Sequence, residues 1–238
     1  MKIAIIGYGK MGHIVERTAK ARGHEIVCVI DVDNTADFDS DAFRSAEVAI
    51  EFSTPATAVE NIRSAWEQGI PVVCGTTGWN DMLPTLRDEA DLQHKGLFWT
   101  SNFSIGVNAV MAINRRLAEI LHAHDEYAVS IVESHHIHKK DAPSGTAISL
   151  ANDIVERVDH VSDWCKAEDA TDLRSQLPIM SLREGEEPGT HVIMYDGPAD
   201  TISLIHRAKS REGFALGAVI AAEFMKGKTG FHDMSEII

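Results

Sequence analysis

The chain of 238 residues carries 36 acidic and 22 basic side chains, which leaves a formal net charge of −14. A protein that binds nucleic acid through its phosphates needs a basic surface, so this balance argues against a nucleic-acid-binding protein. The hydrophobic share of 44% is ordinary for a globular chain of one large or two small domains. The composition therefore excludes disordered and collagen-like proteins.

No segment of the sequence is expected to enter a membrane. The longest weakly polar stretch, residues 214–225, contains Glu223 and is shorter than the ~20 apolar residues that a transmembrane helix needs. Residues 1–7 reach a glycine after a few apolar residues, which predicts a strand and no signal peptide. The cysteines are Cys28, Cys74 and Cys165. Their odd number and wide spacing predict neither a disulfide framework nor a cysteine zinc site, and favour the reducing cytoplasm.

Short β-branched runs alternate with helical patterns over the first hundred residues. This alternation is typical of βαβ units that build a parallel sheet. The predicted strands are residues 2–6, 25–30, 48–52, 71–74 and 97–100. The predicted helices are residues 11–22, 55–68 and 81–93, the second of them beginning at Pro55 after a possible cap.

The pattern changes after Asn102, which predicts a domain boundary near residue 104. The expected helices here are residues 106–122, a helix opening at Ala142-Pro143, and residues 213–225. The expected strands are residues 127–133, 178–183, 191–196 and 201–206, with a hairpin turn at Asp196-Gly197. Residues 159–178 are polar and predict no regular element. The fold class that follows is α/β: a Rossmann-like parallel sheet for a nucleotide domain, plus an α+β domain.

A glycine motif follows the first predicted strand directly and precedes the first predicted helix. It runs Gly7-Tyr8-Gly9-Lys10-Met11-Gly12 and matches Gly-x-Gly-x-x-Gly. Glycines at this spacing permit the tight turn and the close approach of a pyrophosphate to free N–H groups at the helix start. A glycine-rich turn that binds nothing is the alternative.

The acidic residue Asp31 ends the second predicted strand, 19 positions after Gly12. A carboxylate about 20 residues after the motif can accept hydrogen bonds from the ribose hydroxyls of NAD. Val32 and Asp33 follow it, so a 2′-phosphate would meet two carboxylates, with Lys10 as the nearest cation. We therefore expect NADH to be preferred, with NADPH possible.

Two further segments follow predicted strands at the same edge of the sheet. Gly75-Thr76-Thr77-Gly78 offers hydroxyls to a nicotinamide ribose, although an ordinary loop that caps the next helix explains the same residues. Ser101-Asn102-Phe103-Ser104 offers Asn102, which could bind a carboxamide or form a hinge.

Cations are concentrated between residues 135 and 140, where five of six side chains are His or Lys. In an acidic chain such a cluster repels itself unless it binds an anion. Pro143 fits the first turn of a helix, which would leave the N–H groups of Ser144, Gly145 and Thr146 free for that anion.

Three alternatives compete with an anion site here. His136 and His138 could bind a metal, but no suitably spaced Cys, Asp or Glu completes a zinc site, and we predict none. Ser144 lacks the Gly-x-Ser-x-Gly pattern of a hydrolase nucleophile. A solvated basic loop would not explain the proline and the Ser-Gly-Thr that follow the cations directly.

The segment from Glu133 to Ala147 resembles the signature of the 4-hydroxy-tetrahydrodipicolinate reductase (dihydrodipicolinate reductase) family. That signature reads Glu-x-His-His-x-x-Lys-x-Asp-Ala-Pro-Ser-Gly-Thr-Ala, and all of its residues are present. The resemblance extends over nearly the whole chain, through the glycine motif, residues 75–78, 101–108 and 205–211. It departs from the family at Val32, where many members have a basic residue, and at residues 157–178.

The resemblance implies a role for each motif. It implies that His135 is the general acid or base and Lys139 the proton donor, and that the substrate binds to His136, Gly145 and Thr146, beside Ser144 of the same helix start. It implies a dinucleotide site formed by Gly7, Tyr8, Gly9, Lys10, Met11, Gly12, Asp31, Gly75, Thr76, Thr77, Thr100, Ser101, Asn102 and Phe103.

The family reduces a cyclic dicarboxylic imine with a nicotinamide cofactor, in the diaminopimelate route to lysine. The resemblance thus implies a dinucleotide domain of residues 1–104 and 210–238, a substrate and oligomerisation domain of residues 105–209, and a homotetramer formed through the second sheet. Two other functions stay open: a dehydrogenase for another small dicarboxylate, and a nucleotide sensor without catalysis.

Overall fold

The computed structural model describes residues 1–238, which form two compact units. The first unit comprises Met1–Asn108 and Arg211–Ile238, and the second comprises Ala109–Ser210. Each unit has its own sheet and its own hydrophobic core.

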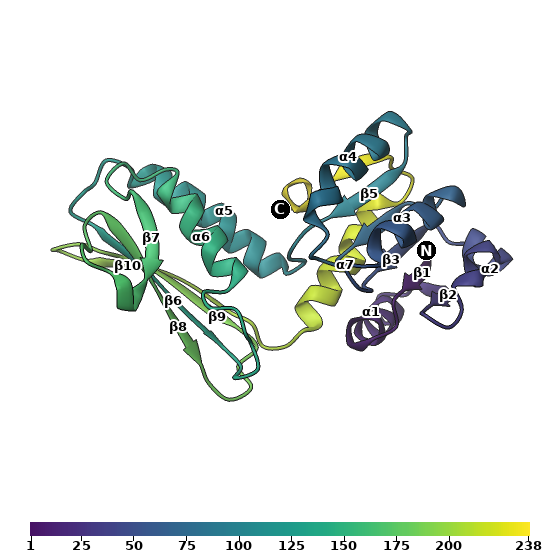
Figure 1. The fold of residues 1–238 in the computed structure, drawn as a ribbon, viewed down its shortest axis with the longest axis horizontal. Helices are drawn as coiled ribbons and strands as arrows, with labels where there is room; N and C mark the ends of the chain where they lie inside the picture. Colours follow the sequence, from purple (N-terminus) through teal and green to yellow (C-terminus); the bar gives the residue numbers. More distant parts are fainter. The chain divides into compact units, whose positions relative to one another are not determined.

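Figure 1 labels most of the helices and strands. The strands are β1 (Lys2–Ile6), β2 (Glu25–Ile30), β3 (Val48–Glu51), β4 (Val72–Cys74), β5 (Gly96–Trp99), β6 (Ala128–His135), β7 (Asp163–Lys166), β8 (Gln176–Arg183), β9 (Thr190–Asp196), β10 (Thr201–Arg207) and β11 (Gly230–His232). The α-helices are α1 (Lys10–Ala21), α2 (Asp41–Arg44), α3 (Ala58–Glu67), α4 (Leu83–Leu92), α5 (Ile105–Ile120), α6 (Gly145–Val155) and α7 (Glu212–Met225).

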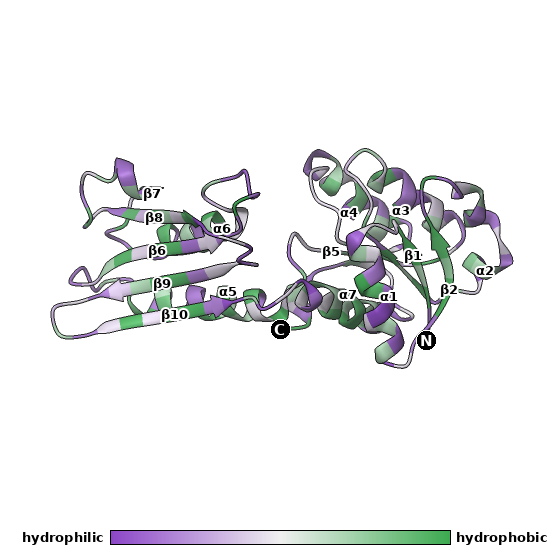
Figure 2. Cartoon of the chain, turned by 90° about the horizontal axis from the view of Figure 1, so that it is seen from below, coloured by the Kyte–Doolittle hydropathy of each residue, from purple (hydrophilic) through white to green (hydrophobic).

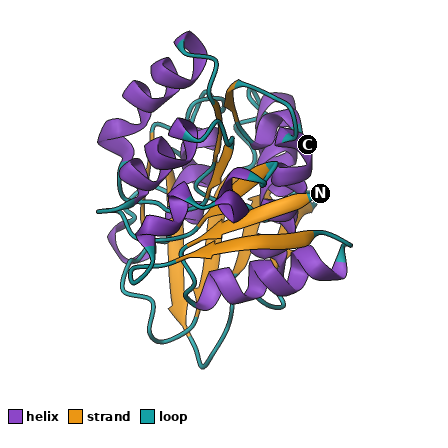
Figure 3. Cartoon of the chain, turned by 90° about the vertical axis from the view of Figure 1, so that its right-hand side faces the viewer, coloured by secondary structure: helices purple, strands orange, loops and turns teal.

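The first unit is built on a six-stranded parallel sheet of order β11-β5-β4-β3-β1-β2. Its strands are apolar on both faces, as a sheet covered on both sides requires. Helices α3 and α4 cover one face, through residues such as Ile62 and Leu86, while α1 and α7 cover the other. Figure 3 shows helices on both sides of these strands. The predicted Rossmann-like sheet is confirmed.

The second unit has a mixed five-stranded sheet of order β10-β9-β6-β8-β7. Strands β6, β8 and β7 run parallel, whereas β9 and β10 form an antiparallel hairpin beside β6. Helices α5 and α6 pack on one face over a core that includes Ile131, Ile193 and Tyr195. Figure 2 shows the opposite face of the sheet, with the strands in front of these helices.

Two strands formed where the sequence predicts none. Strand β7 lies within residues 159–178 and pairs with β8, and β11 lies in the C-terminal tail and pairs with β5. Both are short edge strands, three or four residues long. Their formation depends on the neighbouring strand, which a local pattern does not contain.

Helices α3, α4 and α6 begin later than predicted, α4 at Leu83 and not at residue 81. Helix α3 begins at Ala58 and not at Pro55, because Thr54 closes a turn by accepting the N–H groups of Thr57 and Ala58. Helix α6 begins at Gly145 with Ser144 as its N-cap, so the prediction that Pro143 lies in the first helical turn is wrong. None of the helices combines the length and the apolar character needed to span a lipid bilayer.

Candidate functional site

The glycine motif forms the turn between β1 and α1. Gly7 has a φ of +87°, and a Cβ on it would lie 2.3 Å from the Phe52 carbonyl oxygen. A Cβ on Gly12 would lie 2.3 Å from the Gly7 carbonyl oxygen, whereas the space around Gly9 is open. Gly9 is the N-cap of α1 and has no side chain to occupy the helix start. The turn therefore keeps the room and the N–H groups that a pyrophosphate needs.

The other residues of this motif differ in exposure. Lys10 is exposed at the first position of α1, and Met11 is half-buried. The Tyr8 hydroxyl donates a hydrogen bond to Glu16, and its ring lies against His13 with the centroids 4.0 Å apart. The Tyr8 hydroxyl is thus engaged within the chain.

Asp31 borders a cavity of about 180 Å³ at the carboxyl edge of the first sheet. The lining residues are Ile6, Gly7, Ile30, Asp31, Val32, Thr35, Ser53, Thr57 and Asn61. None of them is basic. The Asp31 side chain is exposed, and its backbone N–H donates to Asn34 Oδ1 at 2.7 Å. The carboxylate therefore borders a cavity whose lining includes hydroxyl and amide groups but no cation.

A second cavity of about 280 Å³ brings three of the predicted cofactor segments together. Its lining residues are Met11, Phe52, Gly75, Ser101, Asn102, Phe103, Arg211 and Phe214. The glycine motif, the loop after β4 and the loop after β5 thus meet at one place, as parallel strands that end at one edge require. Phe52, Arg211 and Phe214 are additions that sequence reasoning missed.

Thr76 and Thr77 are adjacent but play different parts. Thr76 is 6% exposed, and its Oγ1 accepts the Ser53 N–H at 2.8 Å, which joins the loops after β3 and β4. Its carbonyl oxygen accepts the indole N–H groups of Trp79 and Trp99. Thr77 is exposed. The Thr77 hydroxyl is therefore the better placed of the two to contact a ligand.

Residues 100–103 form a turn held by their own hydrogen bonds. Thr100 Oγ1 accepts the Asn102 N–H at 3.2 Å, and Asn102 Oδ1 accepts the Ser104 N–H at 2.8 Å. Asn108 Nδ2 donates to the Asn102 carbonyl oxygen at 2.8 Å. Since Oδ1 of Asn102 is taken, its Nδ2 is the group left for a carboxamide.

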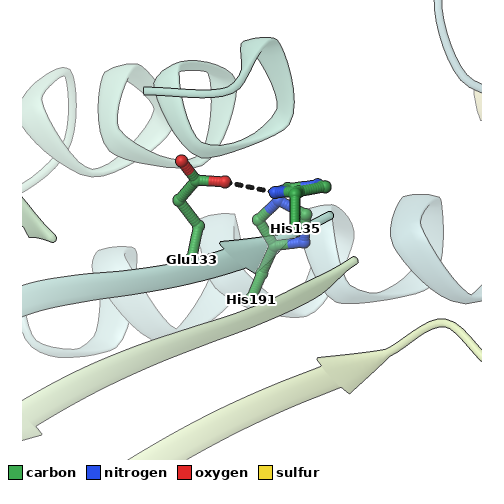
Figure 4. A group of neighbouring side chains, drawn as sticks. All are labelled: Glu133, His135 and His191. Atoms are coloured by element: carbon green, nitrogen blue, oxygen red, sulfur yellow. Dashed lines mark hydrogen bonds and ion pairs between the residues drawn. The ribbon is translucent and has the colours of Figure 1, made fainter. Parts of the chain in front are cut away.

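The cation-rich segment begins at the carboxyl end of β6. The inward side chains of β6 are Val129, Ile131, Glu133 and His135, so this row changes from apolar to charged along the strand. Glu133 is fully buried. Its carboxylate is hydrogen-bonded to His135 Nδ1 (Figure 4). It also accepts a hydrogen bond from Arg183 Nη2 on β8 at 2.8 Å. Burial works to raise the pKa of Glu133, but hydrogen bonds from His135, Arg183 and Ser181 outweigh it and lower the pKa to about 2.

His191 on β9 lies next to this cluster. Its ring meets that of His135 edge to face with the centroids 5.1 Å apart, and its Nε2 lies 3.2 Å from Ser144 Oγ. Burial first, and then the charge of His135, lower the pKa of His191 to about 4. His191 is therefore neutral at pH 7.

Glu133, His135 and His191 offer ligand atoms within 4.8 Å of one another, an arrangement that could suit a metal ion. The guanidinium of Arg183 already supplies a positive charge to the same carboxylate. A divalent cation here would have to lie beside that guanidinium and displace the proton between His135 and Glu133. The geometry therefore favours a hydrogen-bonded cluster over a metal centre.

The start of α6 keeps part of the predicted anion site. Ser144 is 2% exposed, and its Oγ accepts the Ala147 N–H at 3.2 Å besides meeting His191. The Ser144 hydroxyl thus caps the helix and is not free for a ligand. Gly145 is exposed and Thr146 half-buried, and their N–H groups occupy the first turn, where no intrahelical acceptor exists.

The remaining cations of the segment extend from the end of β6. Lys139 Nζ pairs with Asp141 Oδ2 at 2.8 Å, and Arg183 Nη2 donates to the Asp141 carbonyl oxygen at 2.6 Å. His136 is half-buried, and its ring centroid lies 5.9 Å from that of the exposed His138. His138 in turn lies 3.2 Å from a carboxylate oxygen of Glu186. The segment is thus held in place by acidic groups and by Arg183.

Sequence reasoning did not assign roles to Glu133, Arg183 and His191. For Glu133 a signal existed, because it shares the inward row of β6 with Val129 and Ile131, and a buried carboxylate needs a partner. Arg183 and His191 belong to other strands, and only the sheet register places them opposite His135 and Glu133.

Comparisons with known families and proteins agree over the whole chain. The family model described as dihydrodipicolinate reductase, N-terminus, matches residues 1–103, and the one described as dihydrodipicolinate reductase, C-terminus, matches residues 106–238. A 4-hydroxy-tetrahydrodipicolinate reductase of Christiangramia forsetii is 42% identical over 238 residues, covering 100% of this chain and 98% of that protein. One of Archaeoglobus fulgidus is 33% identical, with both chains fully covered.

A solved structure has a similar fold. The dipicolinate-bound dihydrodipicolinate reductase from Paenisporosarcina sp. TG-14 superposes with a TM-score of 0.78 at 23% identity, covering 100% of this chain and 99% of that one. This likeness supports the two-sheet fold described above.

Proposed function

The chain belongs to the dihydrodipicolinate reductase family, and from this premise we propose that it reduces 4-hydroxy-tetrahydrodipicolinate to tetrahydrodipicolinate with a nicotinamide cofactor, in the diaminopimelate route to lysine. The match of both family models along the full chain carries this proposal. The first unit binds the dinucleotide and the second binds the dicarboxylate. The reducing cytoplasm is its compartment, in keeping with three free thiols.

The chemistry of the second unit suits a dianionic substrate. His136, the ammonium group of Lys139 and the N–H groups of Gly145 and Thr146 offset two carboxylates. The nicotinamide supplies a hydride when it is bound. The net reaction replaces the ring hydroxyl of the substrate by hydrogen, so the hydroxyl leaves as water, and His135 or Lys139 delivers the proton that balances this exchange.

One coupled assay tests the proposal against its two rivals. The substrate is generated enzymatically, and NADH oxidation is followed by absorbance. We expect oxidation that depends on that substrate. Oxidation with another small dicarboxylate and none with this one would instead support a different dehydrogenase, and NADH binding without turnover of either would support a nucleotide sensor.

We also propose that NADH is preferred over NADPH. The observation behind this is Asp31, whose carboxylate borders a cavity without a basic lining residue. The 2′-phosphate of NADPH would be repelled by this carboxylate and would find no cation in the lining to pair with. Steady-state kinetics with both cofactors should give the higher kcat/KM for NADH. Asp31→Ala should lower the ratio of kcat/KM for NADH to kcat/KM for NADPH. A higher kcat/KM of the wild type for NADPH would contradict the proposal.

We propose that four chains assemble through the open face of the second sheet. Met180, Leu182 and Ile205 lie on this face and are 48%, 36% and 60% exposed, an apolar strip that solvent would not favour. Light scattering should give four times the chain mass of 26.1 kDa. Ile205→Asp should lower the mass, whereas Leu92→Asp, at an 81% exposed apolar residue of α4, should not. An unchanged tetramer in Ile205→Asp would contradict this interface.

A further inference from the structure

We propose that Glu133 is a positioning residue that holds His135 in one tautomer, with the proton on Nδ1, so that Nε2 is the ring atom that exchanges a proton with the substrate. Figure 4 shows the Glu133 carboxylate directed at the His135 ring. The inference rests on the proposed function, since it assumes that His135 takes part in proton transfer.

The charge state of Glu133 is the first step. The side chain is fully buried, and its second carboxylate oxygen accepts from Arg183 Nη2 at 2.8 Å. A buried carboxylate beside a guanidinium is ionised at neutral pH, because the pair satisfies both charges. An ionised carboxylate has acceptor sites only.

The tautomer follows from that charge state. Since the carboxylate donates nothing, the hydrogen bond with His135 requires a proton on Nδ1. A neutral imidazole carries one ring proton, so Nε2 then has a free lone pair. When a protonated His135 gives its Nε2 proton to the reduced substrate, it is left as this same Nδ1–H form.

His135 Nε2 has no protein side chain beside it on the side of Gly189. Gly189, just before β9, has a φ of +146°, and a Cβ on it would lie 3.0 Å from His135 Nε2. His191, the ring next to His135, is neutral at pH 7 and bonds instead to Ser144. Neither residue therefore competes as a charged partner for His135.

Arg183 connects this pair to the lysine segment. The same Nη2 atom that binds Glu133 also donates to the carbonyl oxygen of Asp141, whose carboxylate pairs with Lys139. The Glu133 carboxylate thus orients His135 directly and, through Arg183, supports the backbone beside Lys139.

Glu133→Gln tests the proposal because it keeps the shape and removes the charge. The amide oxygen should face the Arg183 donors, which leaves the amide NH2 to donate to His135 Nδ1. We therefore expect the neutral ring of the variant to carry its proton on Nε2. We expect kcat to fall by roughly 10²-fold or more while KM changes little, as loss of a general acid or base predicts.

The tautomer is measured by two-bond ¹H–¹⁵N correlation spectra of ¹⁵N-histidine-labelled protein, with His135→Asn identifying the His135 signals. The wild type should show the Nδ1–H pattern and Glu133→Gln the Nε2–H pattern. Glu236→Gln is the matched control, because the exposed Glu236 lies 2.9 Å from Nδ1 of the half-buried His232. It should leave kcat and the His135 signals unchanged.

Two results would overturn the proposal: an Nε2–H pattern in the wild type, which needs no variant to fold, or a kcat of Glu133→Gln within about twofold of wild type. The spectra do not depend on turnover. If the expected tautomers are found but the coupled assay shows no reduction of the substrate, the proposed function fails and the positioning of His135 stands.

Discussion

At the scale of single residues, the charged end of strand β6 determines what the second unit can do. Glu133 and His135 lie on the same inward face of the strand as Ile131, which precedes Glu133 by two positions. The inward face of the strand is therefore apolar at its start and charged at its end, where the segment with Lys139 begins. The N–H group of Gly145, at the start of α6, is available to bind an anion. Substitutions of His135 should therefore affect proton transfer, and substitutions of Thr146 should affect anion binding.

Two substitutions separate these roles. His135→Ala removes a proton donor or acceptor and should lower kcat by roughly 10²- to 10⁴-fold with a smaller effect on KM. Thr146→Val removes one hydroxyl of nearly the same shape and should raise KM by roughly 10-fold, the worth of about one hydrogen bond to a charged group. Steady-state kinetics at saturating NADH measures both. An unchanged kcat in His135→Ala would remove that residue from catalysis.

At the scale of elements, helix α7 is held tightly against the loop after β5. Gly217 is buried, and a Cβ on it would lie 1.7 Å from the Phe103 carbonyl oxygen. Since backbone cannot give way as a flexible side chain does, this contact sets the distance between the helix and a loop of the proposed dinucleotide site. Gly213, one turn earlier in the same helix, is exposed and has nothing within 4 Å of a Cβ.

The two glycines give a matched pair of variants. Gly217→Ala should lower the free energy of unfolding by about 1–3 kcal/mol or more through overpacking, and should weaken NADH binding. Gly213→Ala should be neutral or stabilising by up to about 1 kcal/mol, because alanine is the better helix former. Urea unfolding and NADH titration measure these effects, and equal stabilities of the two variants would contradict the packing argument.

At the scale of the whole molecule, buried titratable groups make the stability depend on pH. The pKa of His191 is about 4 in the folded state, below its ordinary value of 6.5, so the unfolded chain binds more protons between these values. The free energy of unfolding should therefore fall as the pH falls from 6.5 to 4. Glu133, with a pKa of about 2, adds a further loss as the pH falls from 4.5 towards 2.

His191 should account for a loss of about 2 kcal/mol in the free energy of unfolding between pH 7 and pH 5. The charges of His135, Glu133, His206 and Lys139 also act on the pKa of His191. Burial lowers the pKa of the half-buried His206 as well, which acts in the same direction. Urea unfolding of the wild type and of His191→Gln at both pH values isolates its share. The loss on acidification should be smaller in the variant, and equal losses would show that His191 is not responsible.

The sequence by itself determined those elements that depend on the residues within the segment itself. The parallel sheet of the first unit followed from β-branched runs and helical spacing, and the glycine motif from a turn that only glycine permits at residue 7. The signature from Glu133 to Ala147 indicated the family, since its residues are contiguous.

Only the tertiary structure decided which distant groups meet. Register between β6, β8 and β9 places Arg183 and His191 beside Glu133, and sheet pairing creates β7 and β11 from segments without a strong pattern. It also shows that the Ser144 hydroxyl caps helix α6. The physical reason is that these contacts join residues far apart in the sequence, such as Gly96 and Gly230, and their free energy comes from burial and pairing that no local pattern contains.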